Sequence, residues 1–183
     1  MRSTCKLFPE AGSMGGRMIR EAKLNDSEAI AEIIVEAWQG AYAGIVDQKY
    51  VDNMKIQRFV HIMSKNIKQK KEKIFIYEEN EITKGFISGK FIDDKDHQCE
   101  TVGFYVLPKY QRMGIGEKLL LKMKQYFSEN SCRKMMLWTL MGAKNNAFYT
   151  NNGGTITDEK MLNIGDKEYS GVRFSFKLSS ISN

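Results

Sequence analysis

Apolar residues follow two different spacings along the chain, and segments of the two kinds alternate. Short runs rich in β-branched and aromatic residues, separated by polar or glycine-containing turns, predict strands. The expected strands cover residues 18–22, 74–77, 82–91, 100–106, 134–140, 155–164 and 168–178.

Longer segments in which apolar residues recur every three or four positions predict helices. The first of them follows Asn25, Asp26 and Ser27, whose side chains commonly cap helix N-termini. The expected helices cover residues 27–38, 48–70 with a break near Met54, 114–128 and 145–150, with a loop over residues 39–46.

This order of elements predicts the α/β (α+β) class, with a mixed, largely antiparallel central sheet of about six to seven strands flanked by helices. At 183 residues the chain fits one domain, which we expect to cover residues 18–183. Residues 1–17 hold no continuous apolar segment, so we expect a flexible N-terminal extension rather than a secretory signal.

The junction between the expected strand 100–106 and helix 114–128 contains Gly114 and Gly116. Glycines permit a tight turn and let a ligand come close to the backbone. The first N–H groups of the helix point outwards at the positive end of the helix dipole. The junction therefore predicts a phosphate or pyrophosphate site. The alternative is a turn that uses its glycines for geometry only, since neither the P-loop nor the three-glycine dinucleotide spacing is present.

The formal net charge of +6 owes much to one lysine-rich stretch: Lys65, Lys68, Lys70, Lys71 and Lys73. A solvated helix face explains this stretch better than a nucleic-acid surface, because no interleaved aromatic residues or nucleic-acid motif accompany it. A positive field also attracts a phosphate-rich ligand. No apolar run approaches the roughly 20 residues that span a bilayer, so we expect no membrane partner.

The three cysteines, Cys5, Cys99 and Cys132, lack metal-ligand spacing. They favour a reducing cytoplasm without a disulfide scaffold, in which Cys99 and Cys132 serve as small packing residues. His61 and His97 show no zinc-site pattern, and we expect them at the surface or against a helix. No metal is expected.

The segment from Tyr105 to Gly116 resembles the acyl-CoA-binding motif of the GNAT superfamily of N-acetyltransferases, which reads Gln or Arg, two variable residues, Gly, one variable residue, then Gly or Ala. Phe148 and Tyr149, followed by Gly153, are similar to the family's later Phe-Tyr…Gly segment, and residues 37–45 resemble its first helix and loop. The resemblance spans about residues 18–178. It implies that the fourth and fifth strands splay apart to admit the pantetheine arm of acetyl-CoA.

The resemblance also implies a cofactor site. Backbone N–H groups from about Arg112 to Glu117 would hold the pyrophosphate, and the Arg112 side chain would add a charged bond unless it is only a solvated turn residue. An N–H near Val106 would polarise the thioester carbonyl. The residues expected at this site are Tyr105, Val106, Leu107, Gln111, Arg112, Met113, Gly114, Ile115, Gly116, Glu117, Asn145 and Tyr149.

Two catalytic residues are implied in the same way. Glu100 corresponds to a family carboxylate that takes the amine proton directly or through water, and its alternative role is a solvated edge acid. Tyr149 corresponds to the tyrosine that protonates the departing thiolate, and its alternative role is packing against the neighbouring strand. Where many members have an aromatic residue, this chain has Gly154, which we expect to loosen the local packing.

The loop after the first helix forms a wall of the acceptor site in this family, so Trp38, Tyr42 and Ile45 are the expected substrate-binding residues. Trp38 alone also fits a core position. The function implied is acetyl-CoA-dependent transfer of an acetyl group to a primary amine, on a small molecule or a peptide, by direct attack. The alternative is a non-catalytic acyl-CoA-binding regulatory module. A homodimer is left open.

Overall fold

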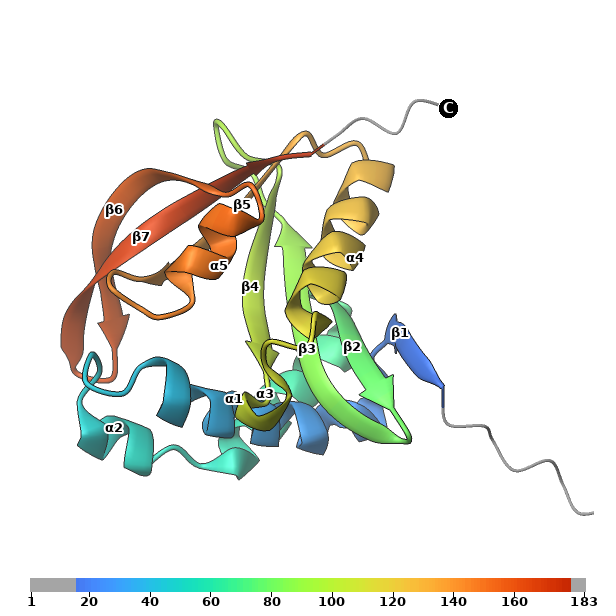
Figure 1. Cartoon of the computed structure of the whole chain (residues 1–183), viewed down its shortest axis with the longest axis vertical. Helices are drawn as coiled ribbons and strands as arrows, with labels where there is room; N and C mark the ends of the chain where they lie inside the picture. Colours follow the sequence, from blue (N-terminus) through green and yellow to red (C-terminus); the bar gives the residue numbers. More distant parts are fainter. Residues whose placement is uncertain (1–15, 179–183) are drawn as a thin grey trace, which may run out of the picture.

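The computed structural model describes residues 16–178, and a seven-stranded sheet forms their centre (Figure 1). The strand order is β1-β2-β3-β4-β5-β7-β6. The strands are β1 (Arg17–Glu21), β2 (Lys73–Glu79), β3 (Ile82–Phe91), β4 (Cys99–Val106), β5 (Lys134–Leu140), β6 (Thr155–Ile164) and β7 (Lys167–Lys177). The expected mixed, largely antiparallel sheet is confirmed.

The pairing of β4 with β5 is parallel, whereas every other neighbouring pair in the sheet is antiparallel. The ladder between β4 and β5 joins only Cys99, Glu100 and Thr101 to residues 135–137. Beyond Thr101 the two strands separate, as Figure 1 shows around the label of β4. The expected splaying of the fourth and fifth strands is therefore confirmed.

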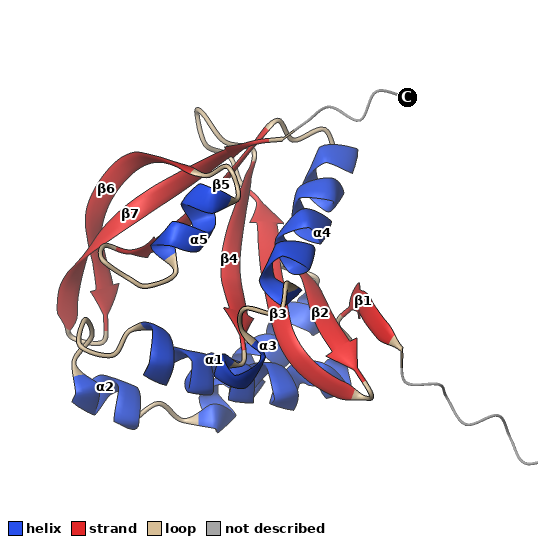
Figure 2. Cartoon of the chain, in the orientation of Figure 1, coloured by secondary structure: helices blue, strands red, loops and turns tan. Residues whose placement is uncertain are grey.

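Helices cover both faces of the sheet (Figure 2). Alternate residues of β2 show the division: Phe75 and Tyr77 pack with α4, while Ile74 and Ile76 pack with α1 and α3. The helices are α1 (Ser27–Ala41), α2 (Gln48–Asp52), α3 (Ile56–Gln69), α4 (Ile115–Glu129) and α5 (Asn146–Asn151). No helix within residues 16–178 is long and apolar enough to cross a bilayer.

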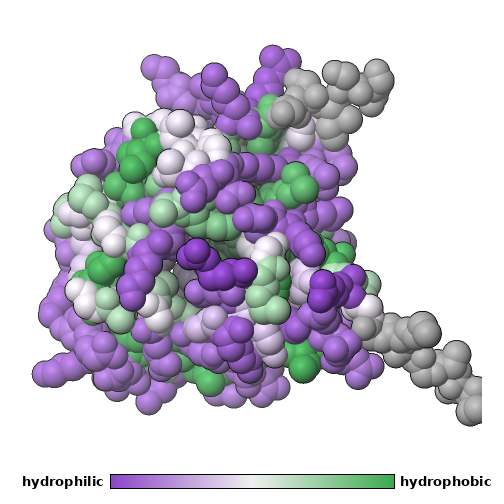
Figure 3. Space-filling view, viewed as in Figure 1, coloured by the Kyte–Doolittle hydropathy of each residue, from purple (hydrophilic) through white to green (hydrophobic). Residues whose placement is uncertain are grey.

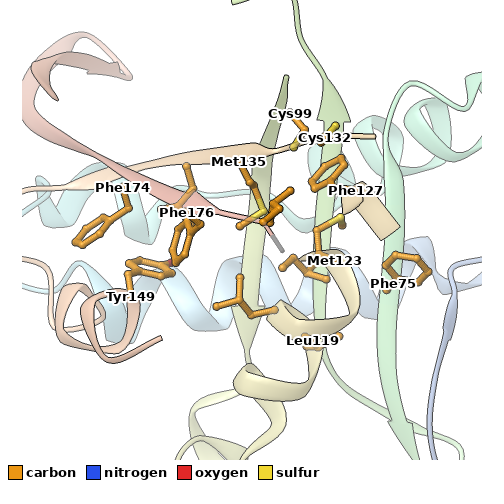
Figure 4. Close-up of a cluster of buried hydrophobic side chains, with 14 of the residues drawn as sticks. Phe75, Cys99, Leu119, Met123, Phe127, Cys132, Met135, Tyr149, Phe174 and Phe176 are labelled. Carbon is orange, nitrogen blue, oxygen red and sulfur yellow. The ribbon is translucent and has the colours of Figure 1, made fainter. Parts of the chain in front are cut away.

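The larger hydrophobic cluster lies between the sheet and α4 (Figure 4). Leu119, Met123 and Phe127 recur on one side of α4 and are fully buried where the helix packs on β2, β3 and β4. Cys99 and Cys132 lie side by side here as free thiols, and burial raises the pKa of both. Their burial supports the expected packing role, while Cys5 lies outside the described residues.

The helix bounds differ from expectation at one informative place. The helix expected over residues 27–38 continues to Ala41. Gly40 does not end this helix, because the Tyr42 N–H still donates to the Trp38 carbonyl. The rings of Trp38 and Tyr42 also pack edge to face, with centroids 4.8 Å apart. The expected break near Met54 is confirmed, since α2 and α3 lie on either side of it.

Other boundaries shift by a residue. β1 begins at Arg17, one residue earlier than expected, and the rest of the expected extension, except Gly16, lies outside the described residues. Asp26 precedes α1, but its carboxylate does not cap that helix. It accepts the Lys23 N–H at 2.6 Å and two bonds from Arg20 at 2.8 and 2.9 Å.

Two expectations about single residues are wrong. His97 is buried in the loop before β4, where its ring contacts the Asp94 carboxylate at 3.2 Å and the Ser175 hydroxyl at 2.8 Å. Gly154 does not loosen the packing, because a Cβ there would lie 2.8 Å from the Phe176 ring and 2.9 Å from the Tyr149 carbonyl. The Phe176 ring fills the space that a larger residue would need.

Candidate active site

The N-terminus of α4 has the geometry that the glycine turn predicts. Arg112 and Gly114 both have positive φ, 63° and 76°, and a Cβ on Gly114 would meet nothing within 4 Å. The first helical bond runs from Lys118 N–H to the Gly114 carbonyl at 3.2 Å, so the N–H groups ahead of it have no partner within the helix. With Arg112 and Met113 exposed beside them, these groups form an open anion site.

The second glycine, Gly116, sets how closely α5 approaches this helix end. A Cβ on Gly116 would lie 3.3 Å from the ring of Phe148, which in turn packs against Phe104 with ring centroids 5.7 Å apart. Phe148 therefore links the start of α4, the free part of β4 and α5. The segments that the sequence motifs mark separately meet at this point.

The backbone of β4 turns unpaired groups towards β5 beyond Thr101. Leu107 N–H donates to the carbonyl of Lys84 in β3 at 2.9 Å. Because backbone groups alternate along a strand, the Val106 N–H is directed to the opposite edge of β4, towards β5. The Val106 carbonyl on that side accepts a bond from Gln111 Nε2 at 3.1 Å. Gln111 thus holds the end of β4 from the glycine turn, and its expected contact with a ligand would compete with this bond.

Tyr149 projects from α5 into the gap between the separated strands. Its ring packs on Phe174 at 5.2 Å, and its hydroxyl accepts a bond from Asn145 Nδ2 at 3.3 Å. Burial raises the pKa of Tyr149, so the phenol stays protonated in the neutral range. Asn145 Oδ1 is buried and makes no hydrogen bond of good geometry within residues 16–178, which leaves an acceptor beside Tyr149.

A narrow slot of about 20 Å³ passes between β4 and β5. Phe104, Leu137 and Tyr149 belong to the α4 face of the sheet, while Tyr105 belongs to the opposite face. The slot is lined by Tyr42, Thr101, Val102, Phe104, Tyr105, Leu137, Trp138 and Tyr149. It therefore connects the two faces where the strand ladder has ended.

A larger hollow of about 540 Å³, the aromatic cavity, lies next to the slot. Tyr42, Tyr105 and Trp138 line both. Trp38 Nε1 donates to the Tyr105 hydroxyl at 3.1 Å, and burial raises the pKa of Tyr42 and Tyr105. The aromatic cavity is lined by Trp38, Tyr42, Tyr50, Arg58, Tyr105, Trp138, Thr139, Leu140, Leu162, Asn163, Ile164 and Gly165. Its volume suits a small-molecule or short peptide ligand.

The face that carries α4 and α5 is also hollowed (Figure 3). The recess lies near the middle of the view, between the place of β4 and that of α5 in Figure 1, and mostly hydrophilic side chains surround it. The unpaired edge of β4, the start of α4 and Tyr149 all belong to this side. A long, polar-ended ligand can approach the slot from here.

Not every expected site residue lies at the slot. Glu100 pairs with Met136 where the ladder is still intact, its carboxylate lies 3.4 Å from Lys90 Nζ, and it lines neither the slot nor the aromatic cavity. Ile45 packs with the cluster around Val46 and Val51 rather than lining the cavity. Trp38 and Tyr42, by contrast, both face it.

The sequence reasoning missed Tyr50, Arg58 and Trp138 as cavity residues. Trp138 carried a signal, because it interrupts the aliphatic run of β5 with a large ring that has a polar N–H. Arg58 carried another, since no acidic residue stands three or four positions away on its helix. Tyr50 lies in a short helix without a pattern that singles it out.

The residues present fit acetyl-CoA better than a metal. The open N–H groups of α4, the unpaired edge of β4 and the unsatisfied Asn145 Oδ1 offer donors and an acceptor along one path. Within residues 16–178, no three side chains of the metal-binding kinds gather together.

Comparison with known proteins gives concordant matches. The model of the acetyltransferase (GNAT) family matches residues 28–153. The uncharacterized N-acetyltransferase YuaI of Bacillus subtilis (strain 168) is 27% identical over 135 residues, 72% of this chain and 76% of that protein. The spermidine N(1)-acetyltransferase of Thermoplasma acidophilum is 24% identical over 146 residues, 76% of this chain and 89% of that protein.

Two solved structures share the fold. The PaiA N-acetyltransferase of Thermoplasma acidophilum in complex with coenzyme A superposes with a TM-score of 0.71 at 21% identity, over 88% of this chain and 99% of that one. The structure of yncA from Salmonella typhimurium with acetyl-CoA gives 0.66 at 19% identity, over 91% and 96%.

Proposed function

The chain belongs to the GNAT acetyltransferase family, and from this premise we propose that it moves an acetyl group from acetyl-CoA to a primary amine by direct attack. The observation that carries the proposal is the slot, whose lining comes from both faces of the sheet and shares Tyr42, Tyr105 and Trp138 with the aromatic cavity. A thioester held along the unpaired edge of β4 would be within reach of an amine held in that cavity. No covalent acyl-enzyme is needed, because the two reactants meet there.

The donor site is assigned to the α4 side. The backbone N–H groups that start α4 would hold the pyrophosphate, and exposed Arg112 would add a charge-assisted bond. The unpaired edge of β4 would bond the pantetheine amides. Acetyl-CoA supplies an activated acyl group when it is bound. The Val106 N–H, directed away from β3, would donate to the carbonyl oxygen as negative charge develops on it.

Tyr149 is proposed as the group that donates to the departing sulfur. Tyr149 lines the slot and its raised pKa keeps it protonated, so its hydroxyl could donate a hydrogen bond where the thiolate charge develops. Asn145 bonds the same hydroxyl from the other side and fixes its position. In this proposal each of the two atoms that gain negative charge would have a hydrogen-bond donor.

Glu100 is proposed as the acceptor of the amine proton, acting through water. The support is the family resemblance and a partly exposed carboxylate at the start of β4. Its carboxylate lies 3.4 Å from Lys90 Nζ of the neighbouring strand β3. Because Glu100 lines neither cavity, water has to carry the proton between them.

Acetyl-CoA and the reduced thiols of Cys99 and Cys132 favour a cytoplasmic location. The acceptor is proposed to be a small or peptide amine. One relative is named a spermidine N(1)-acetyltransferase, so a polyamine is one acceptor to test.

The test is a turnover assay with a panel of amines. The purified chain is incubated with acetyl-CoA and each amine, release of the CoA thiol is followed, and the acetylated amine is identified by mass spectrometry. We expect thiol release that depends on the amine and matches product formed. Tight CoA binding without turnover on any amine would instead support the regulatory module.

A further inference from the structure

The charge of the aromatic cavity is set by one side chain. Among its lining residues in the described chain, Arg58 alone carries a formal charge, and the others are aromatic, aliphatic or neutral polar. Five rings line the walls, those of Trp38, Tyr42, Tyr50, Tyr105 and Trp138. The cavity therefore offers an apolar body with a single cationic group.

The guanidinium of Arg58 has no carboxylate partner. Arg17, Arg20 and Arg173 each form an ion pair with an acid, but Arg58 forms none within residues 16–178. Positions three and four residues away on α3 and before it hold Met54, Lys55, His61 and Ile62, so the helix itself supplies no acid. An arginine that faces a cavity with its donors free is placed to bind an anion.

The surroundings of the cavity reinforce this positive field. Lys160 Nζ lies 4.0 Å from the centre of the Trp138 ring. Two acids of neighbouring segments are paired with cations, Asp47 with Lys167 and Asp158 with Arg173 at 3.5 Å. The lining offers no carboxylate to a polycation, whose charges would face Arg58.

We propose that the acceptor is an amine that also carries a carboxylate, such as an amino acid or a short peptide with an aromatic or aliphatic body. Its carboxylate pairs with Arg58, its body packs on the aromatic walls, and its amine points into the slot at Tyr42 and Tyr105. A guanidinium and a carboxylate form two parallel hydrogen bonds, which fix orientation as well as sign of charge. This inference rests on the proposed transferase function.

Matched substrates test the charge alone. The panel pairs L-phenylalanine and the dipeptide Leu-Phe with their C-terminal amides, and adds spermidine, with rates corrected for the neutral fraction of each amine. We expect kcat/KM for at least one carboxylate to exceed that of its amide by about 10- to 100-fold. In Arg58→Gln this preference should disappear, because kcat/KM for the carboxylate falls to that of its amide. Lys55→Gln, one turn earlier and outside the cavity lining, is the matched control and should keep the preference.

A binding readout separates this inference from the proposed function. The only tryptophans of the chain, Trp38 and Trp138, both line the cavity, so their fluorescence reports on its occupant. Carboxylate-dependent quenching that Arg58→Gln removes, without turnover, would support the inference and count against the transferase proposal. Turnover without a carboxylate preference, a preference for spermidine, or neither quenching nor turnover would each overturn the inference.

Discussion

Replacing Tyr149 by phenylalanine removes one hydroxyl and leaves the ring in place. The ring contacts with Phe174 and Phe148, at 5.2 and 5.7 Å, are retained, so the core should not collapse. The lost bond to Asn145 is long, at 3.3 Å, and we expect the free energy of unfolding to fall by only about 1 kcal/mol. The perturbation is therefore confined to chemistry in the slot.

The expected effect on turnover is much larger. Donation to a departing group by a positioned side chain contributes about 10²- to 10⁴-fold, which is about 3–5 kcal/mol of barrier. We expect kcat of Tyr149→Phe to fall by that factor in the thiol-release assay, while CoA affinity measured by calorimetry stays the same. Because the pKa of Tyr149 is raised above its ordinary value of about 10, wild-type kcat should show no alkaline loss from this group below that pH.

Tyr126→Phe is the matched control. Tyr126 lies in the last turn of α4, packs on Phe75 and does not line the slot, so the loss of its hydroxyl should leave kcat unchanged. An unchanged kcat in Tyr149→Phe as well would refute the role of the phenol. A fall in kcat matched by a loss of CoA affinity would show that Tyr149 holds the donor rather than assisting its departure.

Three further changes test other parts of the structure. Glu100→Gln should lower kcat by about 100-fold without changing CoA affinity if the carboxylate takes the amine proton, and an unaltered kcat would remove it from the mechanism. Gly154→Ala should lower the free energy of unfolding by about 1–3 kcal/mol in urea denaturation, because its Cβ would lie 2.8 Å from the Phe176 ring. The matched control is Gly40→Ala, whose Cβ would meet only Pro108 at 3.8 Å, and it should stabilise α1 by about 0.5–1 kcal/mol. Burial alone would raise the pKa of Asp26, but its hydrogen bonds with Arg20 and the Lys23 N–H outweigh burial, so the pKa of the folded state is lowered. The ionised carboxylate therefore stabilises the fold above the unfolded pKa of about 3.9, and this stabilisation is lost as the pH falls through the lower folded pKa. Asp26→Asn should thus lose about 1–3 kcal/mol at pH 7 and converge with the wild type near pH 3, and a constant difference at both pH values would contradict this.

The sequence predicted the parts of the site that depend on local chain geometry. The glycine turn follows from residues adjacent in the chain, since a strand, two glycines and a helix start determine where the N–H groups point. The splayed strands and the position of Tyr149 came with the family motif. These features need no knowledge of which distant segments meet.

The aromatic cavity could not be predicted, because six separate elements and the β6–β7 turn build it. Arg58, Tyr50 and Trp138 come from α3, α2 and β5, and only the packing of these elements brings them together. Glu100 shows the same limit in another form. Its neighbour Lys90 depends on strand register, which a bulge at Ser88 and Gly89 shifts.

The short ladder between β4 and β5 has a consequence for the order of events in turnover. The proposed donor groups belong to the α4 face of the sheet and Tyr105 of the aromatic cavity to the opposite face, so under the proposed function one reactant would not have to leave before the other arrives. Initial rates measured at several fixed acceptor concentrations should give lines that intersect rather than run parallel. The released CoA and the acetylated amine also have separate exits, so excess acceptor should not trap CoA in its site. The shortness of the β4–β5 ladder, which ends at Thr101, is therefore what would allow both reactants to be bound at once.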